Sequence, residues 1–353
     1  MEWKRYAKSF FAAAFIVSIL GCSGCAMHSE PSFDKNGIAM DTTISLSASG
    51  KEAKEAVDEG FQRIEQLDAL ARSQDPNSDV SHINQAAGQH YVQVDPAVYE
   101  MVAFSKMYAE KSNGMFDITV GPLISLWDIG NEDQHIPAQA EITDALKKIN
   151  YKDILLRPED HSIMLAKPGM AIDLGSVAKG FAVDEVRKIY EAHHITRGLI
   201  NMGSSSMYAI GKTSKGKAWN IGIKHPRSDK SGDYLGIVSI ENQALSTSGD
   251  YERYFIQDGV RYCHIFDPRT GYPAAANVMS DSIAVDGSVE HAGMLSDVLT
   301  TVVFVMGPEK GLEFVNTIDG IECEITSQDG ALYMTDNFKA HFSDMNKDFH
   351  LQE

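Results

Sequence analysis

Residues 291–307 read HAGMLSDVLTTVVFVMG, an almost wholly apolar stretch that ends at Gly307-Pro308. This composition predicts a buried helix, because a helix that is apolar on every side has to be enclosed by other elements. Asp297 and Thr301 stand four residues apart and therefore share one face of the helix. An ionised carboxylate on a buried helix needs a partner, since an unpaired buried charge costs more free energy than folding can spare.

Two kinds of partner are compatible with this stretch. A hard cation is one, because a carboxylate and a hydroxyl are oxygen ligands of the type that Mg²⁺ or Ca²⁺ accepts. In the other interpretation, Asp297 interacts with the dipole at the helix start, and Thr301 bonds back to a main-chain carbonyl. The stretch alone favours the second interpretation.

The rest of the chain is typical of a globular protein. It has 353 residues, of which 43% are hydrophobic and 23% charged, which is ample for a large core. The formal net charge of −18 argues against a nucleic-acid partner, which would require a basic surface. No GxGxxG motif opens a helix after a strand, so a Rossmann dinucleotide site is unsupported.

The N-terminus has the pattern of a bacterial lipoprotein. Three basic residues precede an apolar run at 10–20 that is too short to span a membrane comfortably. The run ends in Gly-Cys, so we expect a signal peptide over 1–21, a diacylated Cys22 and a polar tether over 22–36. The protein would then be extracytoplasmic and lipid-anchored to the bacterial cell membrane. Cys25 is a second candidate for lipidation, and an ordinary secretory signal is the alternative.

Residues 37–345 predict a single large α+β domain, with a mixed or antiparallel sheet core and flanking helices. Helical periodicity marks both ends of this region, and short β-rich runs fill 199–272. Two further cysteines, Cys263 and Cys323, could pair or remain free thiols. The expected elements are strands at 38–48 and 281–285, helices at 51–71 and 96–112, and a loop that enters a helix over 173–192.

Three further clusters carry candidate chemistry. In DLGSVAKG at 173–180, Asp173 could accept ligand N–H groups, and Lys179 with the loop amides could meet a phosphate. In YCHIFDPRTG at 262–271, His264 could orient a ring or transfer a proton, and DPRTG is a turn sequence. In NGMFDITVGPL at 113–123, an apolar pair could contact a flat ring. Each cluster has an ordinary structural interpretation when taken alone.

The order and spacing of these clusters resemble the FAD:protein FMN transferase (ApbE) family from about Met40 to Gly307. The other segments that carry the resemblance are Met40–Thr42, Asp75–Ser78, Leu126-Trp127, Asn201–Gly203 and Ser246–Gly249.

The resemblance implies that FAD is bound with Mg²⁺, and that FMN is transferred to a Thr hydroxyl of an acceptor protein with release of AMP. The implied metal ligands are Asp297, Thr301 and the main-chain carbonyl of Ser176. Asp297 and His264 are the candidate catalytic residues, and His264 is one candidate for the general base. The implied FAD-binding positions are Met40, Met115, Phe116, Asp117, Asp173, Lys179, His264 and Ile265.

Some positions depart from the family pattern, and other functions remain open. Asp41 stands where the family usually has Gly, Ser204-Ser205 replaces a common Gly-Asp pair, and Gln74 stands where an aromatic residue is common. An FAD pyrophosphatase would use water in place of the Thr hydroxyl. A flavin-binding lipoprotein without enzymatic activity would not need the pair formed by Asp297 and Thr301.

Overall fold

The computed structural model describes residues 30–352, and residues 31–353 form one compact unit. The expected signal peptide and the lipidation candidates Cys22 and Cys25 lie outside the described residues. None of the helices within 30–352 is long and apolar enough to cross a membrane.

A nine-stranded sheet forms the centre of the fold. Its order is β1-β2-β6-β7-β10-β13-β14-β15-β17, and every neighbouring pair is antiparallel except β15 with β17. The mixed sheet within one large α+β domain confirms the expected fold class. Its strands are β1 (Ser32–Ala39), β2 (Thr42–Ser49), β6 (Arg197–Met202), β7 (Ser206–Ile210), β10 (Gln243–Gly249), β13 (Val278–Asp286), β14 (Ile321–Ser327), β15 (Ala331–Met334) and β17 (His350–Leu351).

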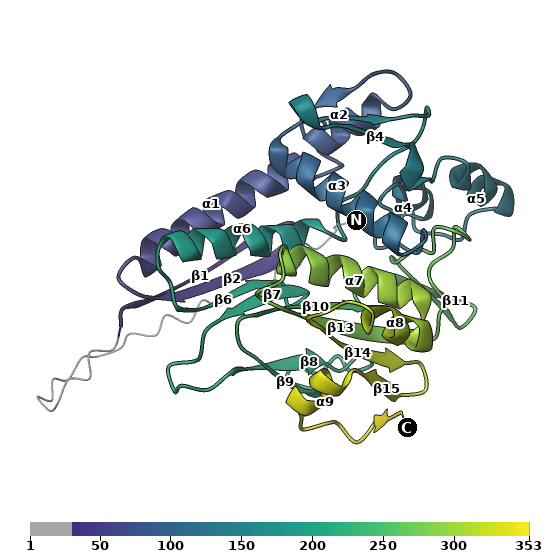
Figure 1. The fold of residues 1–353 in the computed structure, drawn as a ribbon. Helices are drawn as coiled ribbons and strands as arrows, with labels where there is room; N and C mark the ends of the chain where they lie inside the picture. Colours follow the sequence, from purple (N-terminus) through teal and green to yellow (C-terminus); the bar gives the residue numbers. More distant parts are fainter. Residues whose placement is uncertain (1–29, 353) are drawn as a thin grey trace, which may run out of the picture. The chain divides into compact units, whose positions relative to one another are not determined.

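Helices and smaller sheets cover both faces of this sheet. In Figure 1, α1, α6 and α7 lie side by side over one face, while β8, β9 and α9 lie below the other face. The helices are α1 (Ala53–Ala71), α2 (Asp79–Gln85), α3 (Pro96–Lys111), α4 (Gly121–Trp127), α5 (Gln139–Leu146), α6 (Ala178–Ala192), α7 (Ala292–Met306), α8 (Pro308–Val315) and α9 (Asp336–His341), with short 3₁₀ turns at Tyr151–Asp153 and Pro158–Asp160.

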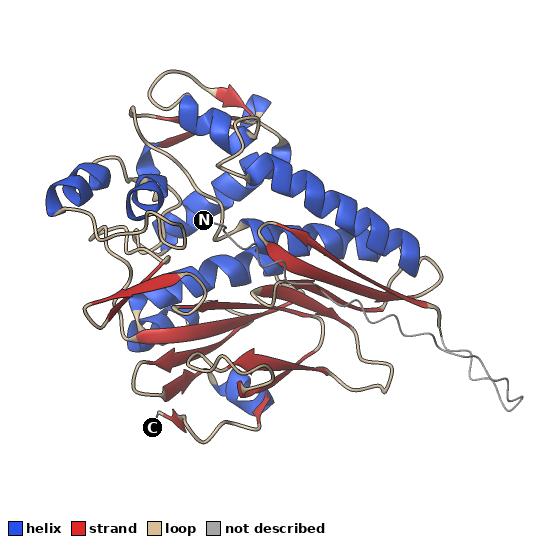
Figure 2. Cartoon of the chain, turned by 180° about the vertical axis from the view of Figure 1, so that it is seen from behind, coloured by secondary structure: helices blue, strands red, loops and turns tan. Residues whose placement is uncertain are grey.

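Three smaller sheets complete the structure. Figure 2, seen from behind, shows the large sheet between the layer of helices and the small sheet that contains β8 and β9. The remaining strands are β8 (Trp219–Lys224), β9 (Tyr234–Ile240) and β16 (Phe342–Ser343) in that sheet, β3 (Val92–Gln93), β4 (Ile154–Arg157) and β5 (Ser162–Leu165) in another, and the hairpin of β11 (Tyr254–Gln257) and β12 (Val260–Cys263).

Helix α7 is the buried helix that the sequence predicted. Thirteen of its residues are buried, because it lies over β10 and β13 with α6 and α8 on its flanks. Gly307 ends it with φ 87°, and Pro308 begins α8. Its hydroxyl side chains are tied to the sheet, since Ser296 bonds to Ser246 at 2.8 Å and Thr300 accepts from Ser248 at 2.8 Å.

The first strand corrects the expected domain boundary. Residues 32–36, which the sequence analysis assigned to the tether, form the first part of β1 and pair with β2. This strand was missed because it is the outer strand of the sheet, where its residues SFDKNGIA are mostly polar and partly exposed. At the other end, β17 extends the folded region beyond residue 345.

Candidate active site

Two glycines allow α6 and α7 to cross at very short range. A Cβ atom on Gly180 would lie 2.2 Å from the carbonyl oxygen of Gly293, and one on Gly293 would lie 2.5 Å from the carbonyl oxygen of Gly180. These distances are far inside van der Waals contact and involve backbone atoms, so any larger residue would push the two helices apart. The crossing brings Asp297 to the first turn of α6.

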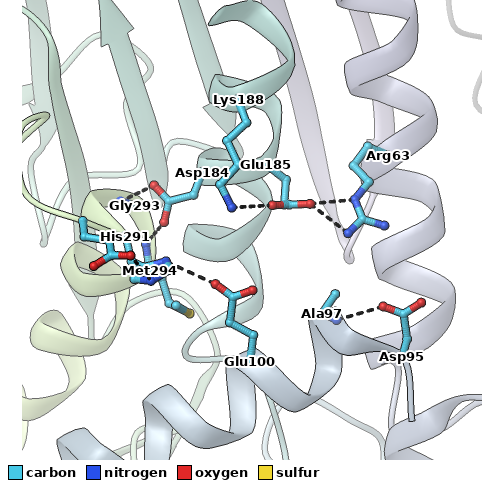
Figure 3. A network of polar contacts seen from close by, with 11 residues as sticks. Arg63, Asp95, Ala97, Glu100, Asp184, Glu185, Lys188, His291, Gly293 and Met294 are labelled. Carbon is cyan, nitrogen blue, oxygen red and sulfur yellow. Dashed lines mark hydrogen bonds and ion pairs between the residues drawn. The ribbon is translucent and has the colours of Figure 1, made fainter. Parts of the chain in front are cut away.

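Each helix supplies a carboxylate to the N-terminus of the other. Asp297 on α7 accepts from the main-chain N–H of Gly180 at 2.9 Å. Asp184 on α6 accepts from the N–H groups of Gly293 and Met294, both at 2.8 Å. Figure 3 shows Asp184 facing this first turn of α7. Carboxylates at helix N-termini satisfy N–H groups that the helix leaves unpaired.

The surroundings of Asp297 affect the ionisation of its carboxyl group. Its side chain is 6% exposed, and its second oxygen accepts from the Ser206 hydroxyl at 3.0 Å. Burial raises the pKa of Asp297, while the positive charge of Lys179 and these two hydrogen bonds act in the opposite direction. Ionised Asp297 would therefore gain from an additional positive partner.

Two further oxygens beside this carboxylate are free of protein hydrogen bonds. Because Gly180 N–H turns to Asp297, the Ser176 carbonyl loses the donor that a regular helix would give it, and no other donor reaches it within the described residues. The Thr301 hydroxyl likewise forms no hydrogen bond with any residue in 30–352. Thr300, rather than Thr301, bonds back to the carbonyl of Asp297, at 2.7 Å. The purely helical interpretation therefore explains Asp297 and leaves Thr301 unexplained.

These oxygens suit Mg²⁺. A carboxylate, a hydroxyl and a main-chain carbonyl are hard oxygen donors, and Mg²⁺ combines a few such ligands with water or phosphate oxygens. No group of three or more His, Cys, Asp or Glu side chains in residues 30–352 is arranged to hold a metal ion. A cation bound here would thus have one anionic ligand, Asp297, and neutral ligands from Ser176 and Thr301.

Lys179 and His264 lie next to this set. Lys179 is half-buried in the first turn of α6 and forms no ion pair within the described residues. Its charge lowers the pKa values of Asp297 and His264, which places it near both. An unpaired ammonium group at a helix N-terminus is well suited to bind phosphate.

The side chain of His264 is neutral at physiological pH. Burial lowers its pKa to about 4, with a further contribution from the positive charges of Arg253 and Lys179. Its Nδ1 lies 3.3 Å from the carbonyl oxygen of Arg253. Because a carbonyl only accepts, Nδ1 carries the proton and Nε2 is left as the free proton acceptor.

Two other expected FAD-binding positions, Asp173 and Met40, lie in turns. Asp173 accepts from Gly175 N–H at 2.8 Å and from the Ser73 hydroxyl at 3.2 Å, so its carboxylate is already oriented. Met40 occupies the turn between β1 and β2 with φ 49° and packs partly against the main core.

The remaining expected binding positions are mainly structural in their side chains. Phe116 is 2% exposed and belongs to the core, as does Ile265 at 7%. Asp117 is 6% exposed and accepts from the Thr119 hydroxyl and from the N–H groups of Thr119 and Tyr151. Burial raises the pKa of Asp117, whereas these hydrogen bonds lower it. Contact between these residues and a ligand would therefore involve their backbone, while half-buried Met115 keeps part of its side chain accessible.

Comparison with known proteins places the chain in a family. The sequence pattern of the ApbE family matches residues 40–325. The chain belongs to the ApbE family. Two relatives named FAD:protein FMN transferase, from Klebsiella pneumoniae and Treponema pallidum, are 31% and 32% identical over 289 and 284 residues. These alignments cover 82% and 77% of this chain, and 87% and 76% of the relatives.

A solved structure agrees with the family assignment. The crystal structure of the ApbE protein of Thermotoga maritima superposes with a TM-score of 0.79 at 31% identity, over 88% of this chain and 99% of that one.

One departure from the ApbE pattern has a structural explanation. Asp41 has φ 56°, a left-handed conformation that favours the glycine expected there. Its carboxylate pairs with Arg72 at 2.9 Å and approaches Arg253 at 3.9 Å. Asp tolerates this conformation better than most residues, and the contacts link the turn at Met40 to the segment beside His264.

The sequence analysis missed Ser206, Ser246 and Ser248 as parts of the site. Ser206 orients Asp297, and the other two bond to α7. The motif at 246–249 was noted, but the serine hydroxyls carry no periodic signal that would identify their partners. Their role depends on the register of β7, β10 and β13, in which Ser206 pairs with Ser246.

The structure shows whether the two cysteines of the folded region form a disulfide. Cys263 and Cys323 are both buried free thiols. Burial raises the pKa of Cys263 to about 11, so its thiol stays protonated and unreactive at neutral pH.

Proposed function

We propose that this chain is an Mg²⁺-dependent flavin transferase that moves FMN from FAD to a Thr hydroxyl of an acceptor protein and releases AMP. The names of the related proteins support FAD and a protein acceptor. The observation that carries the proposal is the set of free oxygens around Asp297, next to the unpaired charge of Lys179.

Binding of the pyrophosphate of FAD would involve the start of α6. Lys179 would provide positive charge for the phosphate oxygens, because the N–H groups of Gly175, Val177 and Ala178 are already bonded within the loop. Bound Mg²⁺, held by Asp297, Thr301 and the Ser176 carbonyl, would supply charge that stabilises the phosphate oxygens in the transition state. Asp173 and Met40 would orient the remainder of FAD.

The reaction is a displacement at phosphorus. The acceptor Thr oxygen forms a bond to the phosphorus of the FMN half, and the bond from that phosphorus to the bridging oxygen breaks. AMP leaves with the bridging oxygen. His264 would receive the hydroxyl proton at Nε2, because its Nδ1 is held by the Arg253 carbonyl and Nε2 is left free.

Mixing the protein with FAD, MgCl₂ and a Thr-containing acceptor domain tests the function. We expect the intact mass of the acceptor to increase by FMN less water, with one AMP released per acceptor. AMP release without acceptor modification would indicate an FAD pyrophosphatase. Metal-independent FAD binding without turnover would indicate a flavin-binding lipoprotein. In the same assay, His264→Gln should lower the transfer rate by about 10²-fold with little change in FAD affinity.

The location of the protein is part of the proposal. The pattern of residues 1–22 supports cleavage before Cys22, diacylation of this cysteine, and attachment to the outer side of the bacterial cell membrane. Metabolic labelling with a palmitate analogue should mark the wild-type protein and Cys25→Ala, but not Cys22→Ala. Labelling that is lost only in Cys25→Ala would move the anchor to that residue.

A further inference from the structure

The β11–β12 hairpin stands apart from the large sheet. Its strands pair through four residue pairs, and Asp258-Gly259 forms the tight turn with φ values of 53° and 78°. Within residues 30–352 neither strand pairs with any other strand. Figure 1 shows β11 at the edge of the molecule. Both edges of the hairpin therefore present unpaired main-chain groups, which proteins usually protect.

One side of the hairpin is fixed to the body of the protein. Phe255 stacks on Tyr262 with ring centroids 5.1 Å apart, and Tyr262 lies 5.7 Å from Trp127. Trp127 is fully buried and donates to the carbonyl of Gly271 at 3.0 Å. These contacts make the hairpin a rigid platform, so its exposure does not result from weak attachment.

The other side is unusually apolar for a surface. Ile256 is 60% exposed and Tyr254 38% on this face, while Val260, which shares the face of Phe255 and Tyr262 but lies beside the turn, is 51% exposed. These are three of the ten exposed large apolar side chains in the described part of the chain, gathered in one hairpin of ten residues. The Arg261 guanidinium lies 3.8 Å from the centre of the Tyr254 ring. Tyr and Arg are the residues most enriched at the centres of protein interfaces.

The hairpin leads directly to the candidate base. His264 follows β12, and its N–H donates to the carbonyl of Arg253 just before β11. Ile256 pairs with Arg261. Arg261 precedes His264 by three residues, which span roughly 10 Å in an extended strand. A protein seated on Ile256 could therefore place a hydroxyl at His264 through three or four extended residues.

Charge also distinguishes this surface. The whole chain has a formal charge of −18, yet Arg253 directly precedes the hairpin and Arg261 lies on β12, opposite Ile256. The Arg253 side chain is 58% exposed, and its ion pair with Asp41 is long, at 3.9 Å. Carboxylates on a partner are thus favoured here and disfavoured over most of the remaining surface.

From these features we infer that the β11–β12 hairpin is the docking surface for the acceptor protein, which would lay an extended segment with flanking carboxylates beside it. The inference rests on the proposed function. A segment that pairs with a free strand edge gains main-chain hydrogen bonds, while Ile256 and Tyr254 bury apolar surface against it.

Steady-state transfer to a purified Thr-containing acceptor domain tests the inference. The double variant Tyr254→Ser with Ile256→Ser should lower kcat/KM for the acceptor by about tenfold or more, mainly through KM. FAD affinity should stay within about twofold, because neither side chain belongs to the flavin site. Leu155→Ser on β4, which removes another exposed aliphatic side chain (38% exposed), should leave kcat/KM unchanged.

The possible outcomes separate this inference from the proposed function. Normal transfer by the double variant would overturn the docking role and leave the transferase assignment intact. A loss of FAD affinity equal to the loss of kcat/KM would also overturn it. If the wild-type protein modifies no acceptor while it binds FAD, the proposed function fails and the docking role fails with it. A photo-crosslinking residue at position 256 should capture the acceptor, whereas one at 155 should not.

Discussion

Replacing Asp297 with Asn should abolish FMN transfer while leaving the protein folded. Asn has the same shape but supplies no anionic ligand, and its amide nitrogen cannot accept from either Gly180 N–H or the Ser206 hydroxyl. We expect the transfer rate to fall by at least about 10³-fold, because charge neutralisation on phosphate is the largest contribution to such reactions. The affinity for Mn²⁺, measured by calorimetry in the absence of FAD, should fall in parallel.

Asp184→Asn is the matched control for this substitution. Asp184 is also a buried carboxylate at the crossing of α6 and α7, and it accepts two N–H bonds from α7. Each of its two oxygens accepts one of these N–H groups, so its replacement should lower the melting temperature but keep Mn²⁺ affinity and transfer within about tenfold of wild type. Normal transfer by Asp297→Asn, or equal losses in both variants, would remove Asp297 from the chemistry.

The sequence predicted those elements that have a clear hydrophobic periodicity or a helix-ending residue. The apolar run at 291–307 located α7, and Gly307-Pro308 marked its end correctly. The amphipathic patterns near 51–71 and 96–112 located α1 and α3 within two residues. The first part of β1 was missed because an outer strand with a polar sequence has no alternating apolar signal.

The hydrogen-bond partner of Asp297 could not be predicted from the sequence. Spacing placed it on one face with Thr301, but the contact with Gly180 joins residues 117 positions apart. Asp297 caps the N-terminus of α6. The structural interpretation had expected it to interact with the start of its own helix, α7. The same bond releases the Ser176 carbonyl. The structural and the metal-binding roles are therefore compatible, which could be recognised only after α6 and α7 were seen to cross.

Replacing Glu324 with Gln should stabilise the protein at alkaline pH. Glu324 is fully buried on β14, and one of its carboxylate oxygens has no hydrogen-bond partner within the described residues. Burial raises its pKa to about 8. The neighbouring Asp281 on β13 is also fully buried, with neither carboxylate oxygen paired within residues 30–352, and burial together with the charge of Glu324 raises its pKa. Glu324 is thus held protonated in the folded protein at neutral pH.

The pH dependence follows from proton release on unfolding. Between the ordinary pKa of Glu, 4.5, and its folded value of about 8, the unfolded chain loses the proton that the folded chain keeps, so the free energy of unfolding falls as pH rises. The amide introduced by Glu324→Gln carries no such proton. The advantage of this variant over wild type should be near zero at pH 4.5 and grow to at most ~5 kcal/mol above pH 8. Urea unfolding at pH 5 and pH 9 measures both ends of this range.

Glu322→Gln provides the control on the same strand. The Glu322 carboxylate accepts from Gln243 at 3.0 Å and lies 3.3 Å from His341, so its charge has partners that Glu324 lacks. Its replacement should give no alkaline stabilisation, because it removes a paired acceptor instead of an unpaired acid. Equal pH profiles for wild type and Glu324→Gln would mean that Glu324 is ionised in the folded protein, which requires a cation or a donor at its free oxygen.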